Sequence, residues 1–105
     1  MLQIDKIYLS VDSRRKIFKE EPECITDVVV ELRSGERFLA SFFCYAKIWE
    51  MKKEFEKSGK FLAGTYFWAK DMVLVDNIER GTIKKIVEHL IEEGDFLDVF
   101  RRISM

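Results

Sequence analysis

Few residues of this 105-residue chain have the type and spacing of a catalytic centre. His89 is the single histidine, which excludes multi-histidine metal sites and leaves one side chain suited to acid–base work near neutral pH. It falls beside the apolar stripe of a predicted helix, and no motif supplies a nucleophile or an orienting partner. We therefore expect a histidine at the boundary of a packed helix face and no catalytic residue, which favours a protein that is not an enzyme and leaves an enzyme as an alternative.

The two cysteines, Cys24 and Cys44, form no C-x-x-C pair and have no second type of metal ligand nearby. Glu23 beside Cys24 disfavours a thiolate, and the aromatic neighbours of Cys44 favour burial, which would raise its pKa. We expect two free thiols that serve packing in a reducing compartment, with no metal and no cofactor. A disulfide between them is not needed for this interpretation.

Aromatic residues are concentrated in the middle of the chain, where ten of the fourteen fall between Phe38 and Trp68. Most must belong to the core, but a small sheet cannot easily hide all of them, and aromatics are enriched at interfaces and in ligand pockets. Asp71 could serve as an acid within such a pocket or simply pair with a basic side chain. The candidates for an interface or a ligand cleft are Tyr45, Trp49, Tyr66, Trp68 and Asp71.

Acidic residues without a compensating base gather between Ile86 and Phe100. They are Glu88, Glu92, Glu93, Asp95 and Asp98. A solvated helix face is the simplest interpretation, and a basic protein partner is the alternative. No Asp-x-Asp-x-Asp-Gly loop accompanies these acids, so calcium binding is not indicated.

The charges of the predicted helix over residues 80–93 run against its dipole. Lys84 and Lys85 lie near its N-terminus, and Glu92 and Glu93 lie at its C-terminus. Each such exposed charge costs only about 0.3–1 kcal/mol, so the helix tolerates them.

Overall composition excludes several classes of protein. The net charge is −1, with 48% hydrophobic and 35% charged residues, which fits neither a disordered polyelectrolyte nor a basic nucleic-acid binder. The five glycines are dispersed, so no phosphate-binding loop is present. The longest apolar run, Phe42 to Ala46, is far too short to span a bilayer, and Asp5 and Lys6 interrupt any signal peptide. We expect a single cytoplasmic domain over residues 1–105 that binds neither nucleic acid nor membrane.

Periodicity predicts strands over about residues 3–11, 26–32, 36–45 and 66–75, with a hairpin turn at Ser34-Gly35. Both faces of the strand over residues 36–45 are apolar, which predicts a central strand covered on both sides. The charged pair Lys70-Asp71 inside the last of these strands suggests a bulge, a turn or an edge. Residues 14–23 are polar and are expected to form a mobile loop.

Helices are predicted over residues 46–57, where Ser58-Gly59 supplies a stop, and over residues 80–93, where Gly94 supplies a C-cap. A short helix capped by Asp95 follows, with Ile103 on its apolar face. The order is β-β-β-α-β-α-α. We predict an α+β domain with an antiparallel sheet of about four strands and two to three helices packed on it.

Three segments carry a resemblance. They are the residues Ala40-Ser41-Phe42-Phe43-Cys44-Tyr45, the residues from Gly64 to Met72, and the residues from His89 to Phe96. They resemble a family of small uncharacterised bacterial proteins of about this length, which has no established activity. The resemblance implies a bacterial cytosolic origin and implies no site residue.

We favour a non-enzymatic protein-interaction module that forms a homodimer through an aromatic-rich surface. One alternative is a small-ligand-binding protein or an enzyme with a cleft around Trp68 and Asp71. Another is an inhibitor-type protein that binds a basic partner through its acidic C-terminal face. Flat exposure of the aromatics would favour association, and their convergence around an inward-pointing Asp71 would favour a ligand.

Overall fold

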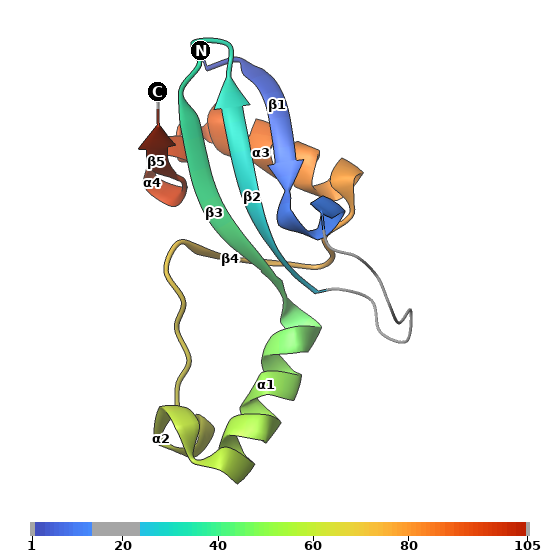
Figure 1. Cartoon of the computed structure of the whole chain (residues 1–105), viewed down its shortest axis with the longest axis vertical. Helices are drawn as coiled ribbons and strands as arrows, with labels where there is room; N and C mark the ends of the chain where they lie inside the picture. The colour runs from blue at the N-terminus through green and yellow to red at the C-terminus, as the bar shows by residue number, and fades with distance from the viewer. Residues whose placement is uncertain (1, 14–23, 105) are drawn as a thin grey trace.

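A computed structural model describes residues 2–13 and 24–104 of the chain as an α+β domain (Figure 1). The polar connection expected over residues 14–23 lies outside the described residues. In chain order the elements are β1 (Ile4–Leu9), η1 (Ser10–Ser13), β2 (Ile25–Leu32), β3 (Arg37–Cys44), α1 (Tyr45–Ser58), α2 (Lys60–Gly64), β4 (Met72–Val75), α3 (Arg80–Glu93), α4 (Phe96–Val99) and β5 (Arg101–Ser104).

The sheet has the order β1-β2-β3-β4, and β5 also pairs with β3. Every pair is antiparallel except β3 with β4, which is parallel. The predicted hairpin joins β2 to β3, and Gly35 takes the positive φ of 93° that its turn requires. The two short strands share the second edge of β3, because β4 pairs with its end near Cys44 and β5 with its start near Arg37.

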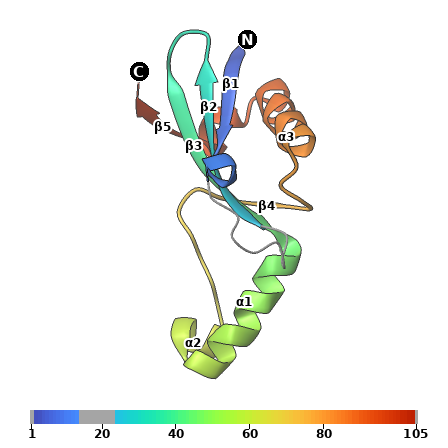
Figure 2. The same ribbon diagram turned by 45° about the vertical axis from the view of Figure 1, so that its right-hand side comes forward.

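The core lies between one face of the sheet and the helices α3 and α4 (Figure 2). Val28 and Val30 of β2 and Phe42 of β3 point into it and are fully buried, as period-two alternation predicts. Ile83 and Val87 form the buried stripe of α3 on the other side. The prediction of a helix over residues 80–93 is confirmed, and Gly94 ends it with a φ of 81°.

The opposite face of the sheet corrects the expectation that β3 is covered on both sides. Among the described residues no helix covers this face (Figure 2), and Leu39 and Ser41 are only half-buried. Only Phe43, near the end of β3, is buried on this face, where it contacts Phe67. Polar side chains extend across the rest of this face. Arg37 pairs with Glu31 at 2.9 Å and lies 5.9 Å from the centre of the Tyr8 ring.

The strand expected over residues 66–75 begins only at Met72. The charged pair Lys70-Asp71 forms a turn, with Asp71 at a positive φ of 56°, and the backbone N–H of Ser41 donates to the Asp71 carbonyl at 2.8 Å. Residues before this turn are held by side-chain packing and not by the sheet.

The sequence predicts that the last helix continues to Ile103, but residues Arg101–Ser104 form a strand. The helix α4 stops at Val99, and β5 pairs with the free edge of β3. Ile103 is therefore a strand residue that is 42% exposed. Backbone pairing to β3 outweighs the local helical period, because an unpaired sheet edge offers a full row of hydrogen bonds.

The helices α1 and α2 do not pack on the sheet and extend away from the body of the molecule (Figures 1 and 2). The helix predicted over residues 46–57 is confirmed as α1, but none of its residues is buried. The principal extents are 46 × 31 × 23 Å, and the radius of gyration of 15.2 Å exceeds the roughly 13 Å of a compact domain this long. We call residues 45–69, with α1, α2 and the chain that returns toward β4, the arm.

Phe96 tests the core assignment, with its neighbour Leu97 as the matched control. Phe96 is 1% exposed and stacks on Phe100 at 4.7 Å between ring centres, while Leu97 is 61% exposed. We expect Phe96→Ala to lower the free energy of unfolding by about 3–5 kcal/mol and Leu97→Ala to change it by less than about 0.5 kcal/mol. Urea titration followed by circular dichroism measures both, and equal effects would contradict the assignment.

Candidate functional site

The interior of the arm is a cluster of aromatic rings. Phe55 of α1 lies 4.8 Å from Phe61 of α2 and 5.8 Å from Phe67 of the returning chain, measured between ring centres. Phe67 also lies 5.9 Å from Phe43 at the end of β3. These rings hold α2 and the returning chain against α1, because edge-to-face and stacked aromatic pairs add to the gain from burial.

The helix α2 is a left-handed turn. Phe61, Leu62 and Ala63 have φ values of 52°, 51° and 55°, between Gly59 and Gly64, which also have positive φ. Left-handed residues other than glycine cost roughly 1–2 kcal/mol each, so packing around the turn must offset the strain. The turn directs Phe61 into the aromatic cluster and leaves Leu62 72% exposed.

The two helices of the arm are held together at Gly64. The Lys52 ammonium donates to the Gly64 carbonyl at 3.2 Å and also pairs with Glu56 at 3.2 Å. A Cβ at Gly64 would lie 2.9 Å from the Lys52 carbonyl oxygen, which is too close. Glycine is therefore required here both for its φ of 79° and for the approach of α1.

The four aromatic candidates from the sequence all belong to the arm, and all are exposed. Tyr45 is 53% exposed and Trp49 66%, and a spacing of four residues places them on the same side of α1. Tyr66 and Trp68, in the returning chain, are 51% and 64% exposed. Five of the nine large exposed hydrophobic residues in the described chain, these four and Leu62, are on the arm.

Asp71 is not free to act as an acid, because its carboxylate accepts a hydrogen bond from Arg101 of β5 at 2.8 Å. Of the two uses that the sequence left open, the structure shows the pairing with a basic side chain. A hollow of about 280 Å³ beside α1 is lined by Phe55, Tyr66 and Leu74, among others, but by neither Trp68 nor Asp71. It is thus distinct from the expected cleft.

The five acidic candidates are all exposed, as a solvated face requires. His89 is exposed too, so it does not lie at a packed boundary as expected, and its Nε2 is 4.0 Å from Glu93. Asp95 occupies the N-cap position of α4, but its side chain makes no capping hydrogen bond. Glu88 and Glu92 line a hollow between β1 and α3.

Cys24 and Cys44 lie opposite each other where β2 begins and β3 ends. The backbone N–H of Cys44 donates to the Cys24 carbonyl at 2.8 Å, and neither thiol is in a disulfide. Burial, a side-chain hydrogen bond with Cys24 and electrostatic repulsion by it raise the pKa of Cys44 from 9.0 to about 11. Cys44 is therefore a packing residue and a poor nucleophile at neutral pH.

Two features went unnoticed in the sequence. Leu62 is presented by the left-handed turn, and the flanking Gly59 and Gly64 were the only signal for it. The hollow between β1 and α3 depends on tertiary structure. In the sequence only the charges of α3, which run against the helix dipole, could have indicated it.

Comparisons with known proteins give no family, since no family model, curated protein or solved structure matches this chain. The resemblance to small bacterial proteins stays a prediction. In the described chain no group of three or more metal-ligating side chains is placed to hold an ion. Nor does any described helix combine the length and apolarity needed to cross a membrane.

The raised pKa of Cys44 predicts a dependence of stability on pH. The folded state binds the thiol proton of Cys44 more tightly than the unfolded state does. The contribution of this proton to the free energy of unfolding is therefore complete below pH 9 and is lost as the pH rises toward 11. The free energy of unfolding should fall by up to about 3 kcal/mol more over this range than it does in Cys44→Ala. Urea titrations of both proteins at pH 8 and pH 10.5, with reductant, measure the difference. Parallel pH profiles would contradict it.

Proposed function

We propose that this chain is a non-enzymatic interaction module that forms a homodimer through the exposed aromatic face of its arm. The observation that carries the proposal is the exposure of Tyr45, Trp49, Tyr66 and Trp68 together on one projecting element. Large exposed apolar patches on a small protein typically mark interaction sites, and tyrosine and tryptophan are the residues most enriched at their energetic centres.

The available area is close to what a specific dimer needs. An aromatic side chain buries about 150–250 Å², so four rings at the exposures given above offer roughly 500 Å² per copy. Two copies would bury about 1,000 Å² through the rings alone, against a lower bound of about 1,200 Å² for stable interfaces. Leu62, 72% exposed at the tip of the arm, supplies part of the remainder.

Two ion pairs compensate part of the charge on the arm. Lys47 pairs with Glu50 at 3.6 Å, and Lys52 pairs with Glu56. These pairs compensate four charges, and the five lysines and three glutamates of the arm leave it a net charge of +2. Two arms would therefore repel each other weakly, and the apolar contact must exceed this repulsion. A rim of exposed ion pairs around an apolar centre is the usual arrangement of interfaces.

The alternatives have less support. A ligand cleft around Trp68 and Asp71 would need an Asp71 carboxylate free of Arg101. An acidic surface for a basic partner rests on exposed carboxylates alone, which solvated helices commonly carry. The absence of a disulfide between Cys24 and Cys44 and the bacterial resemblance support a bacterial cytoplasm as the location of the proposed homodimer.

Light scattering coupled to size-exclusion chromatography tests the dimer at micromolar concentration. We expect a dimer whose mass is unchanged between low and moderate salt, because apolar contacts are hardly screened. Tyr45→Ala with Trp68→Ala should raise the dissociation constant by at least about 30-fold, the effect of losing one interface hot spot. Tyr8→Ala with Leu97→Ala is the matched control, since it removes two exposed apolar side chains elsewhere and should leave the dimer intact.

A monomeric wild-type protein would overturn the proposal. So would a dimer that survives in the double arm variant. A complex that weakens steeply between low and physiological salt would instead assign association to the charged surfaces, including the acidic residues from Glu88 to Asp98.

A further inference from the structure

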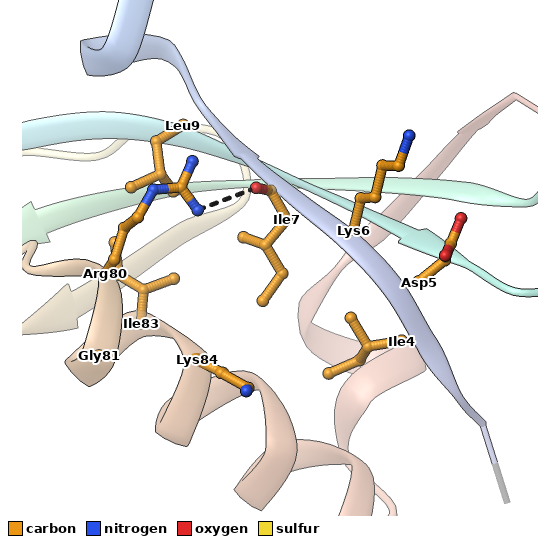
Figure 3. Close-up of a pocket in the computed structure, with 9 residues that line it drawn as sticks. All are labelled: Ile4, Asp5, Lys6, Ile7, Leu9, Arg80, Gly81, Ile83 and Lys84. Atoms are coloured by element: carbon orange, nitrogen blue, oxygen red, sulfur yellow. Dashed lines mark hydrogen bonds between the residues drawn. The ribbon is translucent and has the colours of Figure 1, made fainter.

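A groove runs between the edge strand β1 and the helix α3. It consists of two hollows of about 290 and 600 Å³, which share Ile4, Asp5 and Lys84 in their linings. The first contains Leu9 and Arg80, and the second contains Ile91 and Glu92, so β1 and α3 run in opposite directions along it. In Figure 3, Ile4 and Ile7 point from β1 toward α3, where Ile83 and Lys84 lie.

The length of the groove suits a short extended segment. The 14 residues of α3 span about 21 Å, and the six residues of β1 span about 20 Å. A strand of about six residues has the same length. Gly81 lines the groove near the start of α3 and contributes no side chain to narrow it.

One wall of the groove is a sheet edge. In the described chain β1 pairs with β2 alone, so the backbone groups that point away from β2 have no strand partner. One of them, the Ile7 carbonyl, accepts a hydrogen bond from Arg80 at 3.2 Å (Figure 3). A side chain from α3 therefore already occupies a position where an added strand would donate.

The other wall is α3, whose charged side chains change from basic to acidic along the helix. Arg80, Lys84, Glu88 and Glu92 follow one another at four-residue steps along α3, and all line the groove. Lys84, Glu88 and Glu92 form no ion pair with any described residue, and their order opposes the helix dipole. A ligand with an acidic group near Lys84 and a basic group near Glu88 and Glu92 would complement this wall, in competition with Asp5 and Arg33, which line the same hollows.

We propose that the groove binds an extended peptide of about six residues, which adds to the sheet as a strand antiparallel to β1. Antiparallel pairing is the slightly more stable kind per residue, and it places the start of the peptide near Leu9 and Arg80. The peptide is acidic at its N-terminal end and basic at its C-terminal end, with β-branched residues between that pack on Ile4, Ile7 and Ile83. Its hydrogen bond to the Ile7 carbonyl replaces that of Arg80. This inference is independent of the homodimer proposed for the arm.

The test uses two fluorescein-labelled peptides with blocked ends. The first has the sequence Glu-Val-Thr-Val-Thr-Lys, and the second exchanges the terminal residues to give Lys-Val-Thr-Val-Thr-Glu. Fluorescence anisotropy at low salt measures their affinities. We expect the first peptide to bind at least tenfold more tightly, and we expect N-methylation of alternate amides to abolish its binding, because these amides donate to β1.

A charge-exchanged protein makes the assignment specific. Lys84→Glu with Glu88→Lys makes the charges of the wall alternate in sign, because Arg80 and Glu92 are unchanged, and should remove the preference between the two peptides. Lys85→Glu with Glu93→Lys is the matched control, because it makes the same exchange at exposed positions of α3 that do not line the groove. This control should keep the wild-type preference.

The proposal would be overturned if neither peptide bound. Equal affinities for both peptides, or a preference unchanged by Lys84→Glu with Glu88→Lys, would also overturn it. If this variant instead abolished the homodimer while Tyr45→Ala with Trp68→Ala left it intact, the groove would belong to a second copy of the chain and not to a peptide.

Discussion

The strand β3 is the constraint on which the rest of this structure depends. It pairs with β2 on one edge and with both β4 and β5 on the other, so three strands, two of them distant in sequence, take their register from it. Its buried residues Phe38, Ala40 and Phe42 also form one wall of the core. Because α1 begins at Tyr45, directly after β3 ends, the direction of this strand determines where the arm projects.

Local patterns were sufficient to predict the elements whose stability is local. The helix α3 has both an unbroken apolar stripe and a glycine stop at Gly94, and the β2–β3 hairpin has Gly35 at its turn. Two elements could not be predicted in this way. The strand β5 pairs with a part of the β3 edge that β4 leaves unpaired, and the left-handed turn α2 packs Phe61 against Phe55 and Phe67, which lie outside the turn.

The sequence predicted that aromatic residues of the arm would be exposed, but it did not predict how the arm arranges them. Composition indicated that a small sheet could not bury ten neighbouring aromatics, and four of them are indeed exposed. Which ones are buried depends on the arm, where Phe55, Phe61 and Phe67 turn inward while Trp49 and Trp68 face solvent. Likewise, the reversed charges of α3 are visible in the sequence, but the edge of β1 that faces them is not.

The strain in the arm bears on whether its shape serves a function. Three left-handed residues cost roughly 3–6 kcal/mol together, a large fraction of the 5–15 kcal/mol that keeps a domain folded. A turn that served only to reverse the chain could use glycine at Leu62, which is 72% exposed and loses little packing. Retaining leucine in this conformation places an apolar side chain at the tip of the arm, beyond the rings that stabilise it. This placement is what the homodimer proposed for the arm would use, because an exposed leucine beyond the rings gains burial only in contact with a second copy.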